Sequence, residues 1–499
     1  MPSAPHTEQE HRAVLESIAR KAMIQRGLLP DFSSAALGEL GKIGAAARSE
    51  NDGVEGGPPI RDLTSLPWCS IDNDDSRDLD QLTCAEVLPS KRVAVRVAVA
   101  DVDALVKKGS AIDEHAEHNT VSVYTPAKNF PLLPERLSTD LTSLGLDQER
   151  LAVVVTLVIG TDGVVQSAEI LRARVRNQAK LAYNSVAAWL DGHGAVPAGI
   201  ARIRGLADNL QLQDRTAQNL KALRHRHGAL DLGTIEAKVV FDGSRISALE
   251  SEQRNRAKEI IEDFMISANG ATARYLAAQK FPSIRRVVRT PKRWDRIVAL
   301  AQENGFKLPL VADSIALDAF LTKARTDDPQ RFPDISLSVI KLLGAGEYVA
   351  ERSGDEAPGH FGLAVRDYAH STAPNRRYAD LITQRLVKAA LAGAAAPYTF
   401  EELDVLARHL TEEEDAANKV ERHVGKSAAA ILFESKVGEQ FDAIVTGAST
   451  KGTWARLLAF PVDGRVVDGF HGIDVGQRIR VELISTDVER GFIDFRKIG

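Results

Sequence analysis

The chain has 499 residues, of which 44% are hydrophobic and 26% charged, and its formal net charge is −5. This length predicts about three domains, and the composition is typical of a soluble globular protein. The first residues lack the apolar core of a signal peptide, and no run reaches the roughly 18 apolar residues of a membrane span, so we expect a cytoplasmic protein without membrane contact. Two cysteines, Cys69 and Cys84, exclude a disulfide framework and lack zinc-site spacing. The acidic balance does not indicate a nucleic-acid binder, although a groove on an acidic protein can be locally basic.

Residues 1–66 are predicted to form a helical module. Apolar side chains recur at helical spacing from Val14 to Met23, a serine at 33 or 34 can cap a second helix, and Asn-Asp-Gly at 51–53 is a hairpin-turn signal. Helices followed by a hairpin suggest a winged-helix-like unit. A plain helical cap on the next domain is the alternative.

Residues 67–434 are predicted to form an α+β domain. Valines alternate with other residues from Val93 to Val99, and residues 152–159 are strongly β-branched, so strands are expected at both places. Further along, helices are expected at 256–276, 377–392 and 401–433. Strands followed by helices, without regular alternation, favour α+β over a doubly wound sheet.

Residues 435–499 are predicted to form a five-stranded barrel of the OB type. Five short strand candidates, at 441–446, 453–457, 464–467, 478–484 and 491–495, are punctuated by glycines. Phe441, Trp454 and Phe470 are candidates for stacking on nucleic-acid bases, with the barrel core as the alternative.

An acidic segment at residues 70–83 is the most informative stretch of the chain. Carboxylates alternate there with the apolar residues Ile71, Leu79 and Leu82, which a solvated loop would not need. Carboxylates fixed at close range repel one another unless a cation lies between them, and oxygen-only ligands favour magnesium or manganese. A polar turn or a calcium loop is the alternative.

The spacing of Asp72, Asp78 and Asp80 resembles the signature of the ribonuclease II/R (RNB-domain) family, an Ile-Asp pair, five residues, then Asp-X-Asp-Asp. The resemblance implies a site for Mg²⁺ or Mn²⁺ held by Asp72, Asp78 and Asp80, with Asp78 and Asp80 also catalytic. Gln81 occupies the fourth aspartate position and would supply a neutral amide oxygen to the metal.

A second stretch, Thr-Ala-Pro-Asn-Arg-Arg-Tyr at 372–378, resembles the family motif Thr-Ser-Pro-X-Arg-[Arg/Lys]-Tyr. Arg376 matches the catalytic arginine of that motif, which stabilises the phosphate under attack. An arginine near a helix start can also bind an anion through two parallel hydrogen bonds.

Further residues match the family's RNA contacts by resemblance alone. Tyr124 matches the tyrosine that stacks on the 3′ nucleotide, and Tyr183 with Glu262 matches a pair that contacts ribose 2′-hydroxyls. The remaining matches are His360, in a segment lining the site, Glu421, near the substrate, and Leu232, where a clamp phenylalanine is known. A core tyrosine or a solvated glutamate is the alternative at each.

Basic residues are expected to line an RNA channel. The candidates are Arg172, Arg174, Arg176, Lys180, Arg285, Arg286, Arg289, Lys292 and Arg293. The resemblance covers residues 67–499, and about 66 residues are too few for the two N-terminal cold-shock barrels that most members carry.

The resemblance therefore implies a magnesium-dependent 3′→5′ exoribonuclease that degrades single-stranded RNA processively to 5′-mononucleotides in RNA turnover, and we expect it to act as a monomer. A catalytically decayed RNA-binding regulator of the same fold is the first alternative, and Gln81 is its best argument. An endonuclease or a DNA-directed hydrolase is the second.

Overall fold

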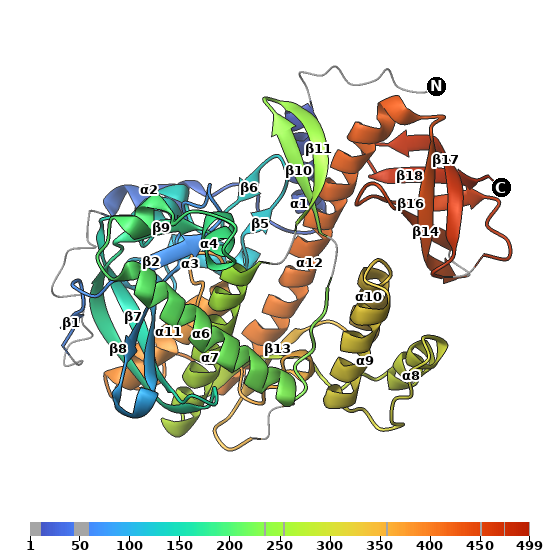
Figure 1. Ribbon diagram of the computed structural model, residues 1–499. Helices are drawn as coiled ribbons and strands as arrows, with labels where there is room; N and C mark the ends of the chain where they lie inside the picture. The colour runs from blue at the N-terminus through green and yellow to red at the C-terminus, as the bar shows by residue number, and fades with distance from the viewer. Residues whose placement is uncertain are drawn as a thin grey trace.

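The computed structural model describes residues 11–43, 59–233, 236–252, 255–355, 358–449, 452–473 and 475–498. Figure 1 shows a mixed α and β body, a small barrel, and a long helix that joins them. In these described residues no helix is both long and apolar enough to cross a membrane.

The body is built on a seven-stranded sheet. Its order is β1 (Arg61–Asp62), β8 (Val165–Arg176), β7 (Glu149–Ile159), β4 (Val93–Ala100), β3 (Gln81–Val87), β2 (Cys69–Asp72) and β9 (Ala179–Ala182). The central strands pair antiparallel, while β1 and β9 add in parallel at the two edges. The two valine-rich strands expected from the sequence are β4 and β7, and the α+β prediction is confirmed.

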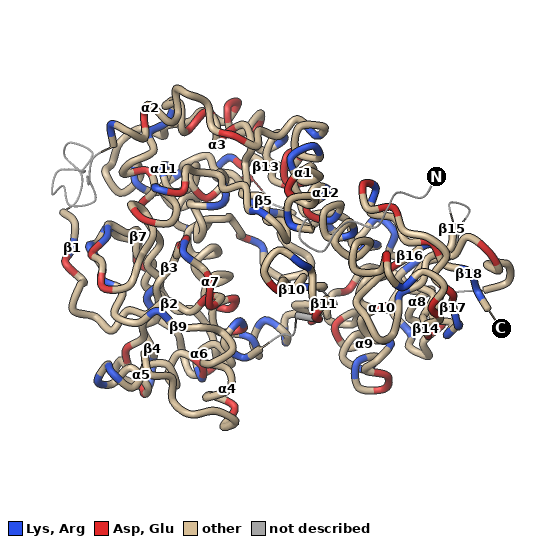
Figure 2. Tube along the Cα trace, turned by 90° about the horizontal axis from the view of Figure 1, so that it is seen from above, with Lys and Arg blue, Asp and Glu red and all other residues tan. Residues whose placement is uncertain are grey.

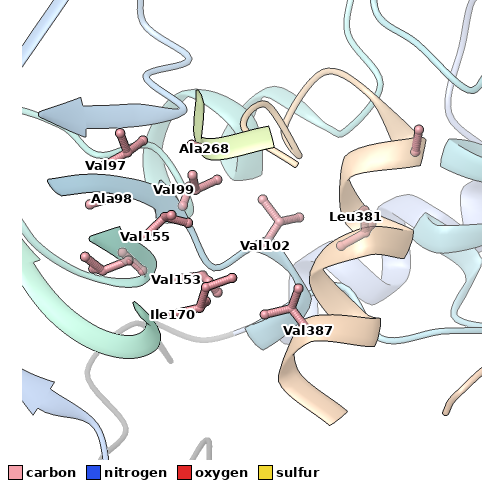
Figure 3. Packing of buried hydrophobic residues seen from close by; sticks show 14 of the residues in the cluster. Val97, Ala98, Val99, Val102, Val153, Val155, Ile170, Ala268, Leu381 and Val387 are labelled. Carbon is pink, nitrogen blue, oxygen red and sulfur yellow. The ribbon is translucent and has the colours of Figure 1, made fainter. Parts of the chain in front are cut away.

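Helices cover this sheet and supply its core. Figure 3 shows Val97 and Val99 of β4 and Val153 of β7 close to Ala268 of α7 (Arg256–Ala278) and Val387 of α11 (Tyr378–Leu391). The other helices of the body are α3 (Ala111–Asn119), α4 (Tyr183–Leu190), α5 (Ala198–Ala201) and α6 (Leu206–Arg226), and a short hairpin joins β5 (Val123–Tyr124) to β6 (Asn129–Phe130).

Two insertions were not expected from the sequence. A hairpin of β10 (Glu236–Asp242) and β11 (Arg245–Glu252) follows α6, and Gly243 adopts the positive φ of 61° that its tight turn requires. Three helices with their own apolar core, α8 (Trp294–Glu303), α9 (Ser314–Asp327) and α10 (Phe332–Leu343), lie between the paired strands β12 (Ser283–Val287) and β13 (Glu347–Glu351).

The C-terminal strands close into the expected five-stranded barrel. They are β14 (Gln440–Ser449), β15 (Gly452–Leu457), β16 (Asp463–Asp468), β17 (Arg478–Asp487) and β18 (Phe492–Lys497). Phe441 packs against Phe433 and Phe460, with ring centroids 5.7 and 6.2 Å away, so it belongs to the core and not to a base-stacking face.

The N-terminal helices α1 (His11–Gln25) and α2 (Ser34–Lys42) pack on the body, and Ser33 caps α2 as expected. Leu15, Ile18 and Met23 of α1 share one apolar cluster with α12 (Phe400–Phe433) and the barrel. This packing favours the helical-cap alternative. The hairpin expected at 51–53 lies outside the described residues.

Candidate active site

The acidic segment connects β2 to β3 and is anchored by buried apolar side chains. Ile71 and Leu79 are 2% and 3% exposed. The backbone N–H of Leu79 donates to Ser143 Oγ at 3.0 Å, and that hydroxyl donates to the carbonyl of Arg77 at 2.7 Å. The anchors therefore hold the neighbouring carboxylates in place, which confirms the reasoning from their alternation.

The strand register brings the carboxylates to one end of the sheet. β2 pairs antiparallel with β3 through Cys69 and Thr83, so the same register continued places Asp72 level with Asp80. Asp78 is close enough to Asp80 to raise the pKa of that carboxyl. Asp78 and Asp80 are thus neighbours, and Asp72 follows on the adjacent strand at the same end of the sheet.

Asp80 is the most constrained member of the group. It is 3% exposed, and its two oxygens accept hydrogen bonds from the backbone N–H of Asn375 at 2.9 Å and from Arg376 Nε at 3.2 Å. Burial raises the pKa of Asp80 to about 7, although Arg376 and the Asn375 N–H oppose this rise. Because burial disfavours the charged form of this carboxylate, a cation nearby would stabilise that form.

The loop that carries Arg376 is fixed by Asp380, the first acidic residue of α11. The fully buried Asp380 carboxylate accepts from the Ala373 N–H at 2.8 Å and from two nitrogens of Arg377, each at 2.8 Å. The amide oxygen of Asn375 accepts from the Thr142 hydroxyl at 2.5 Å. The loop shape therefore presents both donors to Asp80.

Tyr124 connects the acidic group to α12. Its hydroxyl donates to Asp78 Oδ2 at 3.2 Å, and its backbone N–H donates to Glu421 Oε1 at 2.7 Å. The residue is 41% exposed, so its ring is open to a stacking partner. The structure brings Tyr124 and Glu421 to the site where the resemblance expects them.

Tyr183 begins α4 directly after the edge strand β9, and Glu262 lies on α7, which packs against α4. Burial raises the pKa of the Tyr183 hydroxyl, and the charge of Asp72 raises it further, which places this tyrosine near the acidic group. Lys258 Nζ of α7 lies 5.7 Å from the centre of the Tyr183 ring. Glu262 is exposed and follows Lys258 by one helical turn, so both project from the same face of α7.

His360 and Leu232 have mainly structural surroundings. His360 Nδ1 accepts the Leu363 N–H at 3.1 Å and caps the short helix η5 (Phe361–Leu363), and burial lowers the pKa of His360 to about 4, so its ring is neutral. Leu232 is partly buried and packs on the core of the α8–α10 insertion. The contacts of His360 and Leu232 are therefore with η5 and with the α8–α10 insertion.

The prediction that Arg172 and Arg285 line an RNA channel is wrong. Arg172 is paired with Asp101 at 2.9 Å and Arg285 with Glu351 at 3.0 Å, and all four side chains are at least nine-tenths buried. Alternation along the strand cannot show that a charged side chain has a buried partner far away in sequence. The other candidates are half-buried or exposed: Arg174, Arg176, Lys180, Arg286, Arg289, Lys292 and Arg293.

Gln81 has different neighbours from Asp80. As the first residue of β3 it shares a face with Thr83, whose hydroxyl donates to Gln213 of α6 at 2.7 Å. The Gln81 amide oxygen is buried and has no hydrogen-bond donor in the described part of the chain. Such an acceptor fits a cation or a water molecule.

The donor set suits a hard divalent cation, because it consists of carboxylate and amide oxygens. Among the described residues, no three acidic, histidine or cysteine side chains are near enough to one another to hold a metal ion. Asp72 and Asp78 are only half-buried, so their side chains have room to turn toward Asp80.

Positioning residues were the part of the site that sequence reasoning missed. Asp380 follows the 372–378 motif by two residues, so its i,i+3 spacing from Arg377 was a usable signal for a helix-start ion pair. Ser143 and Thr142 had no such signal, because their partners are more than 60 residues away.

Comparison with known proteins places these features in a family. The RNB domain model matches residues 60–393, and the RNase II-type exonuclease C-terminal S1 domain model matches residues 439–498. Ribonuclease R of Aquifex aeolicus (strain VF5) is 28% identical over 464 residues, covering 88% of this chain and 65% of the relative. Ribonuclease R of Vibrio cholerae is 30% identical over 477 residues (88% and 57%), and Exoribonuclease 2 of Escherichia coli (strain UTI89 / UPEC) is 28% identical over 403 residues (80% and 61%). The chain thus spans 57% to 65% of the length of these relatives.

Solved structures share the fold. The apo form of Mycoplasma genitalium RNase R superposes with a TM-score of 0.86 at 22% identity, over 97% of this chain and 78% of that one. Yeast Ssd1, a pseudonuclease, superposes with a TM-score of 0.69 at 16% identity, over 91% and 55%. Because the RNB model alone matches two thirds of the residues, including the acidic segment and the Arg376 loop, the chain belongs to the RNB-domain family.

Proposed function

We propose that this protein is a 3′→5′ exoribonuclease that requires Mg²⁺ or Mn²⁺ and degrades single-stranded RNA processively to 5′-mononucleotides, acting as a monomer. The observation that carries the proposal is the buried Asp80 carboxylate, held between the Asn375 N–H and Arg376 with Asp78 and Tyr124 beside it. Relatives named Ribonuclease R and Exoribonuclease 2 support the direction and the substrate class.

The cation would be held by Asp72, Asp78 and Asp80, with the orphaned Gln81 oxygen as a neutral fourth donor. A divalent cation, when bound, supplies Lewis acidity toward the scissile phosphate and the water that attacks it. The carboxylates accept the proton that this water loses, and burial keeps competing bulk water away from Asp80.

The remaining residues position the RNA. Arg376 uses Nε for Asp80, which leaves its terminal nitrogens to donate to the phosphate and stabilise the charge that develops there. The exposed Tyr124 ring stacks on the terminal base, and its bond to Asp78 ties base position to the acidic group. Tyr183 and Glu262 are assigned to the ribose 2′-hydroxyls.

The test follows 5′-labelled single-stranded RNA on a denaturing gel, with Mg²⁺ or with EDTA. We expect a 5′-labelled fragment that shortens from its 3′ end, mononucleotides as the released product, and no change in EDTA. Addition of excess unlabelled RNA after binding should leave the bound strand's degradation unaffected, because a processive enzyme does not release it. Internal cuts, or equal cleavage of DNA, would replace the proposal with the endonuclease or DNA-directed alternative.

Asp80→Asn separates catalysis from binding. The variant keeps the shape of the side chain but removes one charge from the proposed metal site, so we expect the cleavage rate to fall by about 10⁴-fold while RNA affinity persists. A variant that cleaves at nearly the wild-type rate would remove Asp80 from the chemistry.

A catalytically decayed RNA-binding regulator is the second candidate, favoured by Gln81 in place of the family's aspartate. It predicts RNA binding by the wild type without any magnesium-dependent shortening. Restored cleavage in Gln81→Asp alone would favour this candidate.

A further inference from the structure

A small cavity of about 10 Å³ lies between α6, α7 and the loop that follows α6. The two helices pack on each other, and Figure 2 shows acidic and basic positions on both. Six of the lining residues carry a charge: Lys221, Arg224, Asp231, Glu259, Glu262 and Asp263. A space of this size holds at most one water molecule, so the charges around it are close together and poorly screened.

Arg224 of α6 and Asp263 of α7 form the most buried pair of this cluster. Arg224 donates to Asp263 Oδ1 from Nε, at 3.1 Å, and from Nη2, and the two side chains are 16% and 1% exposed. Burial raises the pKa of Asp263 to about 6, and the charge of Arg224 opposes this rise. Without Arg224, Asp263 would take up a proton or remain as an unpaired buried charge.

Glu262 faces the same cavity from the adjacent position of α7. Its charge also raises the pKa of Asp263, so the two carboxylates repel each other. Glu262 is exposed whereas Asp263 is buried, so Glu262 lies at the boundary between the charge cluster and the solvent side of α7. The state of Asp263 therefore affects where the Glu262 carboxylate settles.

A second ion pair joins the helices one turn earlier. Lys221 Nζ of α6 donates to Glu259 Oε1 of α7 at 2.6 Å, and both side chains are less than a quarter exposed. The two pairs follow each other at one-turn spacing along both helices. They therefore fix the rotation of α7 about its own axis, and with it the direction in which Glu262 leaves the helix.

The end of α6 gives Arg224 a rigid support. The Ala229 N–H donates to the Arg224 carbonyl at 3.0 Å. Gly228 has a φ of 90°, and a Cβ there would lie 2.4 Å from Ser314 Oγ and 2.7 Å from the Ile315 nitrogen. Only glycine lets the chain pass so close to the start of α9, so the turn after α6 is anchored on that helix.

We infer that Arg224 is a positioning residue for sugar recognition, which acts through Asp263 to hold Glu262 toward the ribose 2′-hydroxyl. Arg224 itself does not touch the substrate. A carboxylate accepts a hydrogen bond from a hydroxyl only within a narrow range of distance and angle, so a small rotation of Glu262 lowers the preference for RNA over DNA. The inference rests on the proposed function, because it concerns a residue assigned there to the ribose.

The experiment is a double-mutant cycle of Arg224→Gln and Glu262→Ala in the Asp80→Asn background. Fluorescence anisotropy gives the Kd of RNA and DNA oligomers of one sequence. Glu262→Ala should lower the preference for RNA about tenfold, as expected for a lost hydrogen bond to a charged group. Arg224→Gln should lower it about fivefold by weakening RNA binding alone, and should add nothing once Glu262 is alanine, because the two residues are coupled.

Two further variants separate positioning from general stabilisation. Arg224→Lys keeps a positive charge facing Asp263 and should recover most of the preference. Arg226→Gln is the matched control, since Arg226 lies in the same last turn of α6 but bonds the Asp162 carbonyl at 3.2 Å, outside the cavity. It should bind RNA and DNA as the parent does.

Thermal melting of each variant shows whether it is folded at the assay temperature. If Arg224→Gln is not, the pair Arg224→Gln/Asp263→Asn takes its place. This variant leaves no unpaired buried charge, but it also lacks the guanidinium that fixes the side chain at 263, so the same loss of preference is expected.

Two outcomes overturn the inference while the proposed function stands, provided that the wild type shortens RNA from its 3′ end. Equal weakening of RNA and DNA binding in Arg224→Gln would make Arg224 and Asp263 a purely structural pair. An effect of Arg224→Gln that adds in full to that of Glu262→Ala would show that the two residues act independently. A wild type that neither cleaves RNA nor prefers it over DNA would remove the proposed function, and the inference with it.

Discussion

At the scale of single residues, the site depends on which polar atoms are already satisfied. Asp80 has both oxygens engaged, whereas the oxygen of the next residue, Gln81, is buried and meets no donor among the residues that the structure describes. The spacing of Asp72, Asp78 and Asp80 predicted a shared metal site. The structure places Asp78 near Asp80, but among the described residues no three acidic side chains are near enough to one another to hold a metal ion. The sequence could not predict that Arg172 and Arg285 are neutralised inside the protein, because their partners Asp101 and Glu351 come from distant strands and turns.

Gln81→Asp tests the departure from the family signature. A carboxylate adds one negative charge near the cation, and affinity for hard cations rises with ligand charge, so the magnesium concentration for half-maximal cleavage should fall. The measurement is a magnesium titration of cleavage at fixed pH and ionic strength, with Gln81→Glu as a variant of equal charge and longer reach. Superimposable titrations of wild type and Gln81→Asp would place this side chain outside the metal site, on the α6 side where Thr83 lies.

Tyr183 and Glu262 test discrimination against DNA. If they contact ribose hydroxyls, replacing both with alanine should reduce the preference for RNA over DNA by roughly tenfold or more, because each lost hydrogen bond to a charged or buried group is worth about 1–3 kcal/mol. The comparison uses RNA and DNA oligomers of one sequence. Lys258→Ala is the control, since Lys258 lies near the Tyr183 ring and one helical turn before Glu262 on α7. An unchanged preference would return both residues to a structural role.

At the scale of elements, the catalytic arginine depends on how α11 begins. The helix and its motif were expected from the sequence, and α11 starts one residue later than predicted. What the sequence did not reveal is that Asp380 reaches back to the Ala373 N–H and also pairs with Arg377, so that one carboxylate shapes the whole loop. The β10–β11 hairpin was missed although Asp242-Gly243 is a turn signal, because its strands carry exposed charges instead of a clear apolar alternation.

Asp380→Asn should therefore affect both stability and catalysis. It leaves the Arg377 guanidinium, whose side chain is 26% exposed, without its fully buried partner, and breaking a buried pair costs up to about 3–5 kcal/mol. We expect a lower urea midpoint and a slower maximal rate, with RNA affinity less affected. The matched control is Asp404→Asn, an acidic residue in an exposed ion pair on α12, which should change stability by less than about 1 kcal/mol. A stable Asp380→Asn enzyme with a full maximal rate would show that the loop holds its shape without this carboxylate.

At the scale of the whole molecule, one apolar cluster joins α1, the β5–β6 and β10–β11 hairpins, α12 and the barrel. The sequence indicated α1, α12 and the barrel, but neither of the two hairpins. It could not show that they share a core, because contacts between segments so far apart depend on how the chain packs. We therefore expect the N-terminal helix α1 to contribute to the stability of the fold through its buried apolar side chains.

Met23→Ala tests that role. Met23 is fully buried in the shared cluster, and truncation of such a side chain costs about 2–5 kcal/mol, so the melting temperature should fall by several degrees. Its neighbour Ile24 is 61% exposed, and Ile24→Ala should change stability by less than about 0.5 kcal/mol. If the two variants melt alike, α1 is not packed on the body in solution.

The 34-residue helix α12 also determines how the barrel is oriented relative to the body. Each residue of an α-helix adds about 1.5 Å and turns the chain by about 100°. One alanine inserted after Glu421 would therefore swing the barrel a quarter turn or more around the axis while Tyr124 keeps its partner. Seven inserted residues would restore the direction to within about 20° but carry the barrel about 10 Å outward. The number of residues in α12 therefore determines both the orientation of the barrel about the helix axis and its distance from the active site.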